Sequence, residues 1–235
     1  MRKSRLGLTL VEVLVATVLL GAAITILVYA MTTARENNWR QRCRNNLNQI
    51  AKGMAMYIEY GDNRFYPWPV GRAGCGTVTP DFGGAEGLAA LYWTKTIPDP
   101  GCFLCPSSRD DNGGGRDLGT QGCVGPGFRP GPDAKLRPDA VSYAGMGATS
   151  VAVYERVRLG KSPLSKSAVR DDFPPGEVWT CDDTEGPVHH GRSLWLGGGM
   201  NVLFFDNHVE FWPDTKVDLQ RGVGMAGTPL FYLRN

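Results

Sequence analysis

The chain lacks an excess of charge of either sign. It has 25 basic and 23 acidic residues, and three of the basic residues, Arg2, Lys3 and Arg5, precede Gly7. From Gly7 onward, 25 minus 3 leaves 22 basic residues against 23 acidic ones, so this part is near neutral. The balance argues against the broad basic face of a general nucleic-acid-binding protein, and no specific nucleic acid is expected as a partner.

The sequence also lacks the motifs of common catalytic chemistry. No serine, cysteine or carboxylate pattern supplies a nucleophile or a matched acid and base, and His189, His190 and His208 are the only histidines. The enzyme hypothesis reduces to a membrane-tethered, metal-dependent protein that uses His190, Asp206 and His208 as ligands or acid and base groups. We expect no enzymatic activity.

Charge is absent from residues 8–31 except at Glu12. As a helix these 24 residues would be roughly 36 Å long, enough to cross a hydrocarbon core of about 30 Å. The alternative is a secretory signal cut after Ala30, but the apolar region of such signals has only about 7–15 residues and no acid. An ionised carboxylate deep in a bilayer costs roughly 2.5 kcal/mol or more, so Glu12 needs an explanation.

A basic leader, the stretch GLTLVE at residues 7–12 and a long apolar segment follow one another in order. This order resembles the class III signal of type IV pilins and of the pseudopilins of type II secretion, with Leu8 in place of the commoner phenylalanine. The resemblance implies that a prepilin peptidase and methyltransferase cuts after Gly7 and methylates Leu8. It also implies that Glu12 pairs with the Leu8 ammonium of a neighbouring subunit in a filament.

The expected location and partners follow from the resemblance, because the distribution of basic residues around the span does not decide the orientation in the membrane. Basic residues precede the span and also follow it, at Arg35, Arg40, Arg42 and Arg44. Pilin-like topology implies a single pass through the inner membrane with an extracytoplasmic carboxyl-terminal domain, and then a periplasmic or cell-surface filament. The expected partners are other pilin-like subunits through the amino-terminal helix, the peptidase, an inner-membrane assembly platform and membrane lipid.

Apolar residues recur at helical spacing after the span. Steps of four, four, three, four and four residues predict one apolar stripe, which we expect to pack on its own domain: Trp39, Cys43, Leu47, Ile50, Met54 and Ile58. One helix is therefore expected from about Leu8 to Tyr60, with a stop at Gly61. The expected divisions are a leader (1–7), a transmembrane and assembly helix (8–31), its amphipathic continuation (32–60) and an extracytoplasmic, loop-rich β domain (61–235).

Two apolar runs near the carboxyl terminus, in MNVLFFDNHVEFW at 200–212, are joined at Asp206 and Asn207. These two residues tolerate the conformations of a tight turn, so a hairpin is expected. Alternation predicts that Val209 and Phe211 share one face and that the other face carries His208, Glu210 and Trp212. The rest of the chain from Asp62 reads as short strands and long turns.

This hairpin resembles the carboxyl-terminal signature of a large bacterial group of pilin-like proteins, in which a histidine precedes an Asp-Gly-His turn by nine residues. Here Asn207 replaces the glycine, and fifteen residues separate His190 from Asp206. CPSS at 105–108 and SYAGM at 142–146 resemble further stretches of that group. The resemblance implies an α+β fold, in which a long amino-terminal helix packs on a small antiparallel sheet with long Gly/Pro-rich loops.

The six cysteines have two interpretations. Outside the cytoplasm an even number in a loop-rich domain suggests disulfides, which we favour, although spacing does not give the connectivity. Alternatively, Cys102 and Cys105 supply two zinc ligands that Cys75 and Cys123, or a histidine, complete. The candidate disulfide residues are Cys43, Cys75, Cys102, Cys105, Cys123 and Cys181.

No cofactor is expected, with calcium left open. Asp110, Asp111 and Asp117 in RDDNGGGRD could bind calcium, but their spacing matches no established ligand pattern, and a solvated turn is favoured. The same interpretation applies to Asp182, Asp183 and Glu185. His189, His190 and His208 with Asp206 could form a metal site, although ordinary turn and loop roles are favoured.

Three functions remain to be compared. We favour a structural subunit of a type IV pilus or a type II secretion pseudopilus, which assembles through its amino-terminal helix. The alternative is a minor, tip-located module that binds a sugar, a surface or DNA through Trp68, Trp93 and Trp179. The membrane-tethered, metal-dependent enzyme is the third.

Overall fold

A computed structural model describes residues 9–61, 84–112, 118, 140–146, 175–182, 190, 198–213, 215–216, 230 and 233–234. The chain divides into two compact units, Met1–Asn38 and Trp39–Asn235, and each is described by itself. The helices are α1 (Leu10–Gly61), α2 (Gly84–Trp93) and the 3₁₀ helix η1 (Pro100–Phe103). The strands are β1 (Tyr143–Met146), β2 (Val178–Asp182), β3 (Gly199–Phe204), β4 (Val209–Pro213) and β5 (Leu233–Arg234).

Helix α1 begins with a reciprocal capping arrangement between Thr9 and Glu12. The Glu12 amide donates to Thr9 Oγ1 at 3.3 Å, and the Thr9 amide donates to Glu12 Oε2 at 2.9 Å. The Thr9 hydroxyl also donates to that carboxylate oxygen, at 3.0 Å. Two amides of the first turn, which have no partner within the helix itself, are thereby satisfied. The Thr-x-x-Glu spacing is the sequence signature of such a cap.

The first unit contains the amino-terminal half of α1, which is apolar around its whole circumference. Leu10, Leu19 and Ile26 expose 80%, 64% and 69% of their surface, like the other large apolar side chains of this half. Its threonines donate to carbonyls one turn earlier, as in Thr17 to Leu14 and Thr25 to Gly21, both at 2.9 Å. The helix is long and apolar enough to cross a membrane, and these hydroxyls need no water there.

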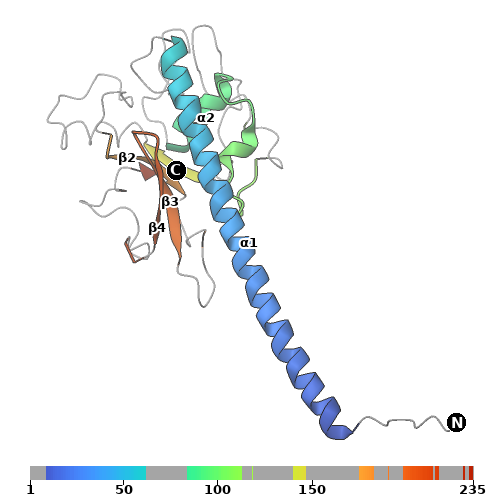
Figure 1. Cartoon of the computed structure of the whole chain (residues 1–235). Coiled ribbons are helices and arrows are strands. Elements are labelled where there is room, and N and C mark those ends of the chain that lie inside the picture. Colours follow the sequence, from blue (N-terminus) through green and yellow to red (C-terminus); the bar gives the residue numbers. More distant parts are fainter. Residues whose placement is uncertain are drawn as a thin grey trace. The chain divides into compact units, whose positions relative to one another are not determined.

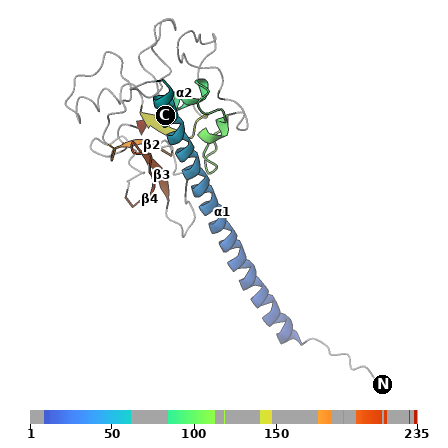
Figure 2. The ribbon, with the colours of Figure 1, turned by 45° about the horizontal axis from the view of Figure 1, so that its top comes forward.

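The second unit includes α1 from Trp39 onward, and the expected apolar stripe is confirmed. Cys43, Leu47 and Ile50 are fully buried, Met54 is nearly so, and Ile58 packs against this core from a half-buried position. Figures 1 and 2 show this part of α1 beside β2, β3 and β4 on one side and beside α2 on the other. The helix ends at Gly61, one residue beyond the expected end.

The described strands form an antiparallel sheet in the order β4-β3-β2-β1-β5, with β5 contributing only two residues. The register aligns Gly199 with Pro213 and Leu203 with Val209 in the β3–β4 pair, and a bulge interrupts β2 between Val178 and Thr180. Every residue of β2 and β3 is buried. The fold class is therefore α+β, as expected.

The expected carboxyl-terminal hairpin is β3–β4, and its turn is one residue longer than the Asp206–Asn207 pair suggests. The Asn207 amide donates to Phe204 O at 3.0 Å, and the Phe204 amide donates to His208 O at 3.1 Å. Asn207 has a φ of 68°, a left-handed conformation that asparagine tolerates better than most residues. The loop thus contains Phe205, Asp206 and Asn207, and the left-handed residue closes it.

The expectation of only strands and turns after Asp62 is wrong for Gly84–Trp93, which is helix α2. It buries Leu88 and Leu91, and β1 packs against it. At its end Lys95 has a φ of 61°, its amide donates to Tyr92 O at 2.9 Å, and the next amide donates to Leu91 O at 3.0 Å. This is a Schellman motif, which ordinarily uses glycine at the left-handed position. A lysine there gives no sequence signal for the helix end.

We expect Leu47→Ala to lower the free energy of unfolding by about 2–5 kcal/mol, because Leu47 is fully buried and a cavity would remain. The measurement is urea unfolding of the full-length protein in detergent micelles, followed by tryptophan fluorescence. Met56→Ala on the same helix is the control, since Met56 is 45% exposed and should cost about 0.5 kcal/mol or less. Equal effects of the two substitutions would contradict the packing described here.

Candidate functional site: a buried cluster of cysteine, histidine and aspartate

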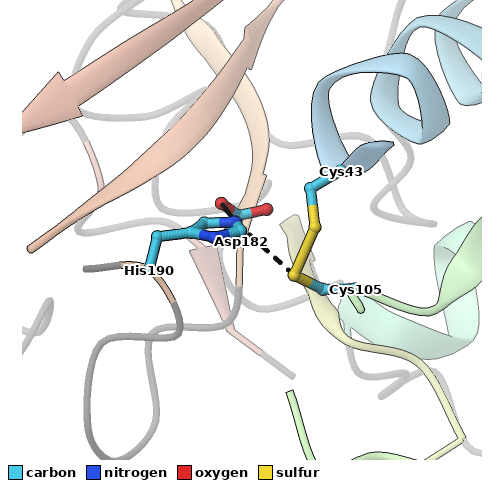
Figure 3. A group of neighbouring side chains, drawn as sticks. All are labelled: Cys43, Cys105, Asp182 and His190. Atoms are coloured by element: carbon cyan, nitrogen blue, oxygen red, sulfur yellow. Dashed lines mark hydrogen bonds and ion pairs between the residues drawn. A yellow bond between two sulfur atoms is a disulfide. The ribbon is translucent and has the colours of Figure 1, made fainter. Parts of the chain in front are cut away.

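Four chemically reactive side chains from distant parts of the sequence meet inside the second unit. They are Cys43 of α1, Cys105 just after η1, Asp182 at the end of β2, and His190, which forms a single β-bridge with Gly199. One ligand atom from each lies within 4.8 Å of the others, and all four residues are buried. Figure 3 shows Asp182 and His190 turned toward the two sulfur atoms.

Cys43 and Cys105 form a disulfide with a Cα–Cα distance of 5.2 Å across 62 positions of sequence. A second link lies one turn along α1, where Asn46 Nδ2 donates to Leu104 O at 2.8 Å. The Asp99 carboxylate accepts the Gly101 amide at 2.9 Å and so caps η1, which leads into Cys105. The chain around η1 is therefore attached to α1 by a covalent bond and a hydrogen bond.

The His190 ring is oriented by partners at both nitrogens. Ser107 Oγ lies 3.0 Å from Nδ1. Asp182 Oδ2 lies 3.2 Å and Cys105 Sγ 3.5 Å from Nε2. The Phe211 ring stands edge-on to the imidazole, with centroids 6.5 Å apart. His190 therefore presents Nε2 to both the carboxylate and the disulfide.

Asp182 is 1% exposed and receives two hydrogen bonds from one residue. The Asn201 amide and Asn201 Nδ2 donate to Oδ2 at 2.6 and 3.1 Å. The second oxygen, Oδ1, has no hydrogen-bond partner among the described residues. Burial, and then the negative charge of Asp182, raise the pKa of Tyr143 well above its ordinary value. The expectation that Asp182 lies in a solvated turn is wrong, because it ends a buried strand.

Ser107, His190 and Asp182 form a hydrogen-bonded series of the kind that activates a serine nucleophile. His190 is 0% exposed, so a substrate could not contact the imidazole in this structure. The series orients the ring and satisfies buried polar groups. Sequence reasoning missed Ser107 and Asn201, because neither lies near its partner in the chain.

One disulfide, Cys43–Cys105, is present among the described cysteines, and two other described cysteines are thiols. Cys102 and Cys181 are buried thiols, while Cys75 and Cys123 lie outside the described residues. Cys102 Sγ donates to Gln49 Oε1 rather than entering the cluster. Burial, with the charge of Asp99 as a second cause, raises its pKa to about 11, so Cys102 stays a thiol at neutral pH. The pairing of Cys102 with Cys105 as joint zinc ligands is therefore not the arrangement found.

The shared histidine metal site, which the sequence analysis weighed but did not favour, is not formed by His190 and His208. His190 is enclosed in the cluster, whereas the exposed side chains of His208 and Asp206 are hydrogen-bonded to each other at the hairpin turn. The slight burial of Asp206 opposes ionisation, but hydrogen bonds from the His208 backbone and ring lower its pKa overall. His189 lies outside the described residues. Asp206 and His208 thus stabilise a turn, and the three residues do not form one site.

The remaining candidates divide between described and undescribed residues. Gly7, Leu8, Trp68, Asp117, Asp183 and Glu185 lie outside the description. Asp110 and Asp111 are not part of any described metal-ligating group. Trp179 is 2% exposed on β2, so it offers no ring for a surface ligand, and nothing is described for the Trp93 side chain.

No protein-family model, curated protein or solved structure matches this chain.

We expect a Cys43→Ser/Cys105→Ser variant to lose about 2–4 kcal/mol of unfolding free energy, because the disulfide closes a long loop in the unfolded chain. Urea unfolding of the full-length protein without reductant measures the loss. Cys102→Ser is the matched control, since Cys102 is buried but not crosslinked and serine retains a donor for Gln49. A double variant as stable as the wild type would show that this crosslink does not stabilise the domain.

Proposed function

We propose that this chain is a structural, pilin-like subunit that assembles through the amino-terminal half of α1 into a type IV pilus or type II secretion pseudopilus. The observation that carries the proposal is the single carboxylate of Glu12 in the first turn of α1, whose amino-terminal half exposes its apolar side chains all around. Such a surface requires either lipid or other apolar helices as its surroundings.

A role as a membrane anchor alone does not explain the Glu12 carboxylate. An ionised carboxylate among apolar groups is costly, and a cation of a neighbouring helix would offset that cost. Cleavage after Gly7 would create such a cation at Leu8, close in sequence to Glu12. In a bundle of identical helices, the ammonium of one subunit and the Glu12 carboxylate of the next would then neutralise each other.

The capping arrangement supports this pairing. Thr9 holds one oxygen of the Glu12 carboxylate over the start of the helix through two hydrogen bonds. The charge is thereby directed toward the end of the helix where the processed terminus would lie. Partial positive charge at the helix start also favours an ionised Glu12.

Mass spectrometry of the intact amino terminus tests the processing step. Protein recovered from its native membrane should begin at methylated Leu8. A Gly7→Leu variant should stay uncut, because a bulky side chain would replace glycine at the cleaved bond. A wild-type chain that begins at Met1 or Met31 would contradict the proposal.

A pair of substitutions separates the charge of Glu12 from its role as a cap. Glu12→Gln keeps an acceptor for the Thr9 amide but removes the charge, so the chain should insert in the membrane and fail to form filaments. Thr9→Val removes the hydroxyl and keeps the charge, so it should still assemble. Filament yield, measured by sedimentation and electron microscopy, is the readout. Normal filaments from Glu12→Gln would remove the ion pair from the proposal.

A further inference from the structure

We propose that reduction of the Cys43–Cys105 disulfide converts the buried cluster into a binding site for one Zn²⁺, with Cys43, Cys105, His190 and Asp182 as its four ligands. The site is independent of filament assembly, because all four residues belong to the second unit.

The spacing of the donor atoms fits a tetrahedral zinc site. Zinc binds sulfur at about 2.3 Å and nitrogen or oxygen at about 2.0–2.2 Å, so ligand atoms of a tetrahedron lie roughly 3.3–3.8 Å apart. His190 Nε2 already lies 3.5 Å from Cys105 Sγ and 3.2 Å from Asp182 Oδ2. The whole set lies within 4.8 Å. Small side-chain shifts would therefore close the site once the sulfur atoms are no longer bonded to each other.

The buried oxygen of Asp182 is a second and independent indication of a ligand. Asp182 Oδ1 has no hydrogen-bond partner in the described part of the chain, although the residue is 1% exposed. An unsatisfied buried acceptor is costly, and native structures rarely keep one without a reason. A cation bound to the Asp182 carboxylate through Oδ1 would supply the missing partner of this oxygen.

Outer partners of the kind found around zinc ligands are already in place. A histidine that binds zinc through one ring nitrogen ordinarily uses the other for a hydrogen bond, and ligating carboxylates are hydrogen-bonded as well. Here Ser107 Oγ lies at His190 Nδ1, and Asn201 holds Asp182 through two donors. Zinc at Nε2 requires the proton on Nδ1, and that N–H can donate a hydrogen bond to Ser107 Oγ.

The disulfide and the zinc site exclude each other. In the disulfide the sulfur atoms are bonded together, and neither is the thiolate that binds zinc. A dithiol reductant would break the sulfur–sulfur bond, supply two electrons and two protons, and become a disulfide itself. Zinc would then form two sulfur bonds and release the two thiol protons. A disulfide oxidant would reverse both steps by taking two electrons, re-forming the Cys43–Cys105 bond and expelling the ion.

Zinc content of the full-length protein in detergent micelles tests the proposal without any substitution. One sample is reduced with excess dithiol and freed of reductant without air, and the other is left oxidised; both then receive Zn²⁺ and are desalted. Circular dichroism checks that both remain folded. We expect about one zinc per chain in the reduced sample and none in the oxidised one. A folded reduced chain without zinc, or equal zinc in both samples, would overturn the proposal.

Variants identify which cysteines bind the metal. Cys75→Ser/Cys123→Ser and Cys102→Ser should keep one zinc per chain, whereas Cys43→Ser/Cys105→Ser should lose it. With Co²⁺ as the probe, reduced wild type should show a thiolate-to-cobalt charge-transfer band that the last variant lacks. Retention of zinc by Cys43→Ser/Cys105→Ser would place the ion elsewhere and overturn the proposal.

A further substitution tests the outer partner of His190 without removing a ligand. Ser107→Ala should weaken zinc binding by the reduced chain about 10–100-fold, and Ser107→Thr should restore it because the hydroxyl returns. Thermal unfolding of the reduced chain with and without Zn²⁺ gives a second readout, since an ion that binds only the folded state raises the midpoint. Unchanged zinc affinity in Ser107→Ala would contradict the arrangement around His190.

Discussion

The bonds around His190 are the constraint on which the second unit depends. The strands have only two to six residues and η1 has four, so their mutual placement requires specific bonds as well as apolar packing. The Cys43–Cys105 bond joins the chain after η1 to α1, and His190 links this crosslink to Asp182 at the end of β2. Because buried polar groups must be satisfied, a shift of any one segment would leave its neighbours without partners.

Helix α1 is one continuous element whose two halves require different surroundings. Around Leu19 its apolar side chains are exposed on all sides, whereas around Leu47 only one stripe is apolar and buried. The first pattern suits lipid or a bundle of like helices, and the second suits the edge of a folded domain. This division is what a subunit needs if it is stored in a membrane and assembles through its helix.

The chemistry of the cluster has a consequence for the stability of the second unit. A crosslink between α1 and the chain after η1 stabilises the domain where disulfides persist, and a bound cation would join the same elements where thiols are reduced. His190 and Asp182 face the sulfur atoms of the disulfide and would be ligands in the proposed zinc site. Glu12 and the cluster belong to different units.

The sequence by itself determined the elements that are specified locally. The stripe through Cys43 and Leu47 predicted the buried face of α1, and the residues around Asn207 predicted the hairpin, because periodicity and turn preference act over a few residues. Helix α2 was not predicted, because Lys95 occupies the left-handed position after the helix where glycine would have marked its end. Only the tertiary structure decided that Cys105 pairs with Cys43, and that Asp182 is buried against His190. These contacts join residues far apart in the chain. Their energy comes from burial and from hydrogen bonds between buried polar groups, which a pattern over a few neighbouring residues cannot predict.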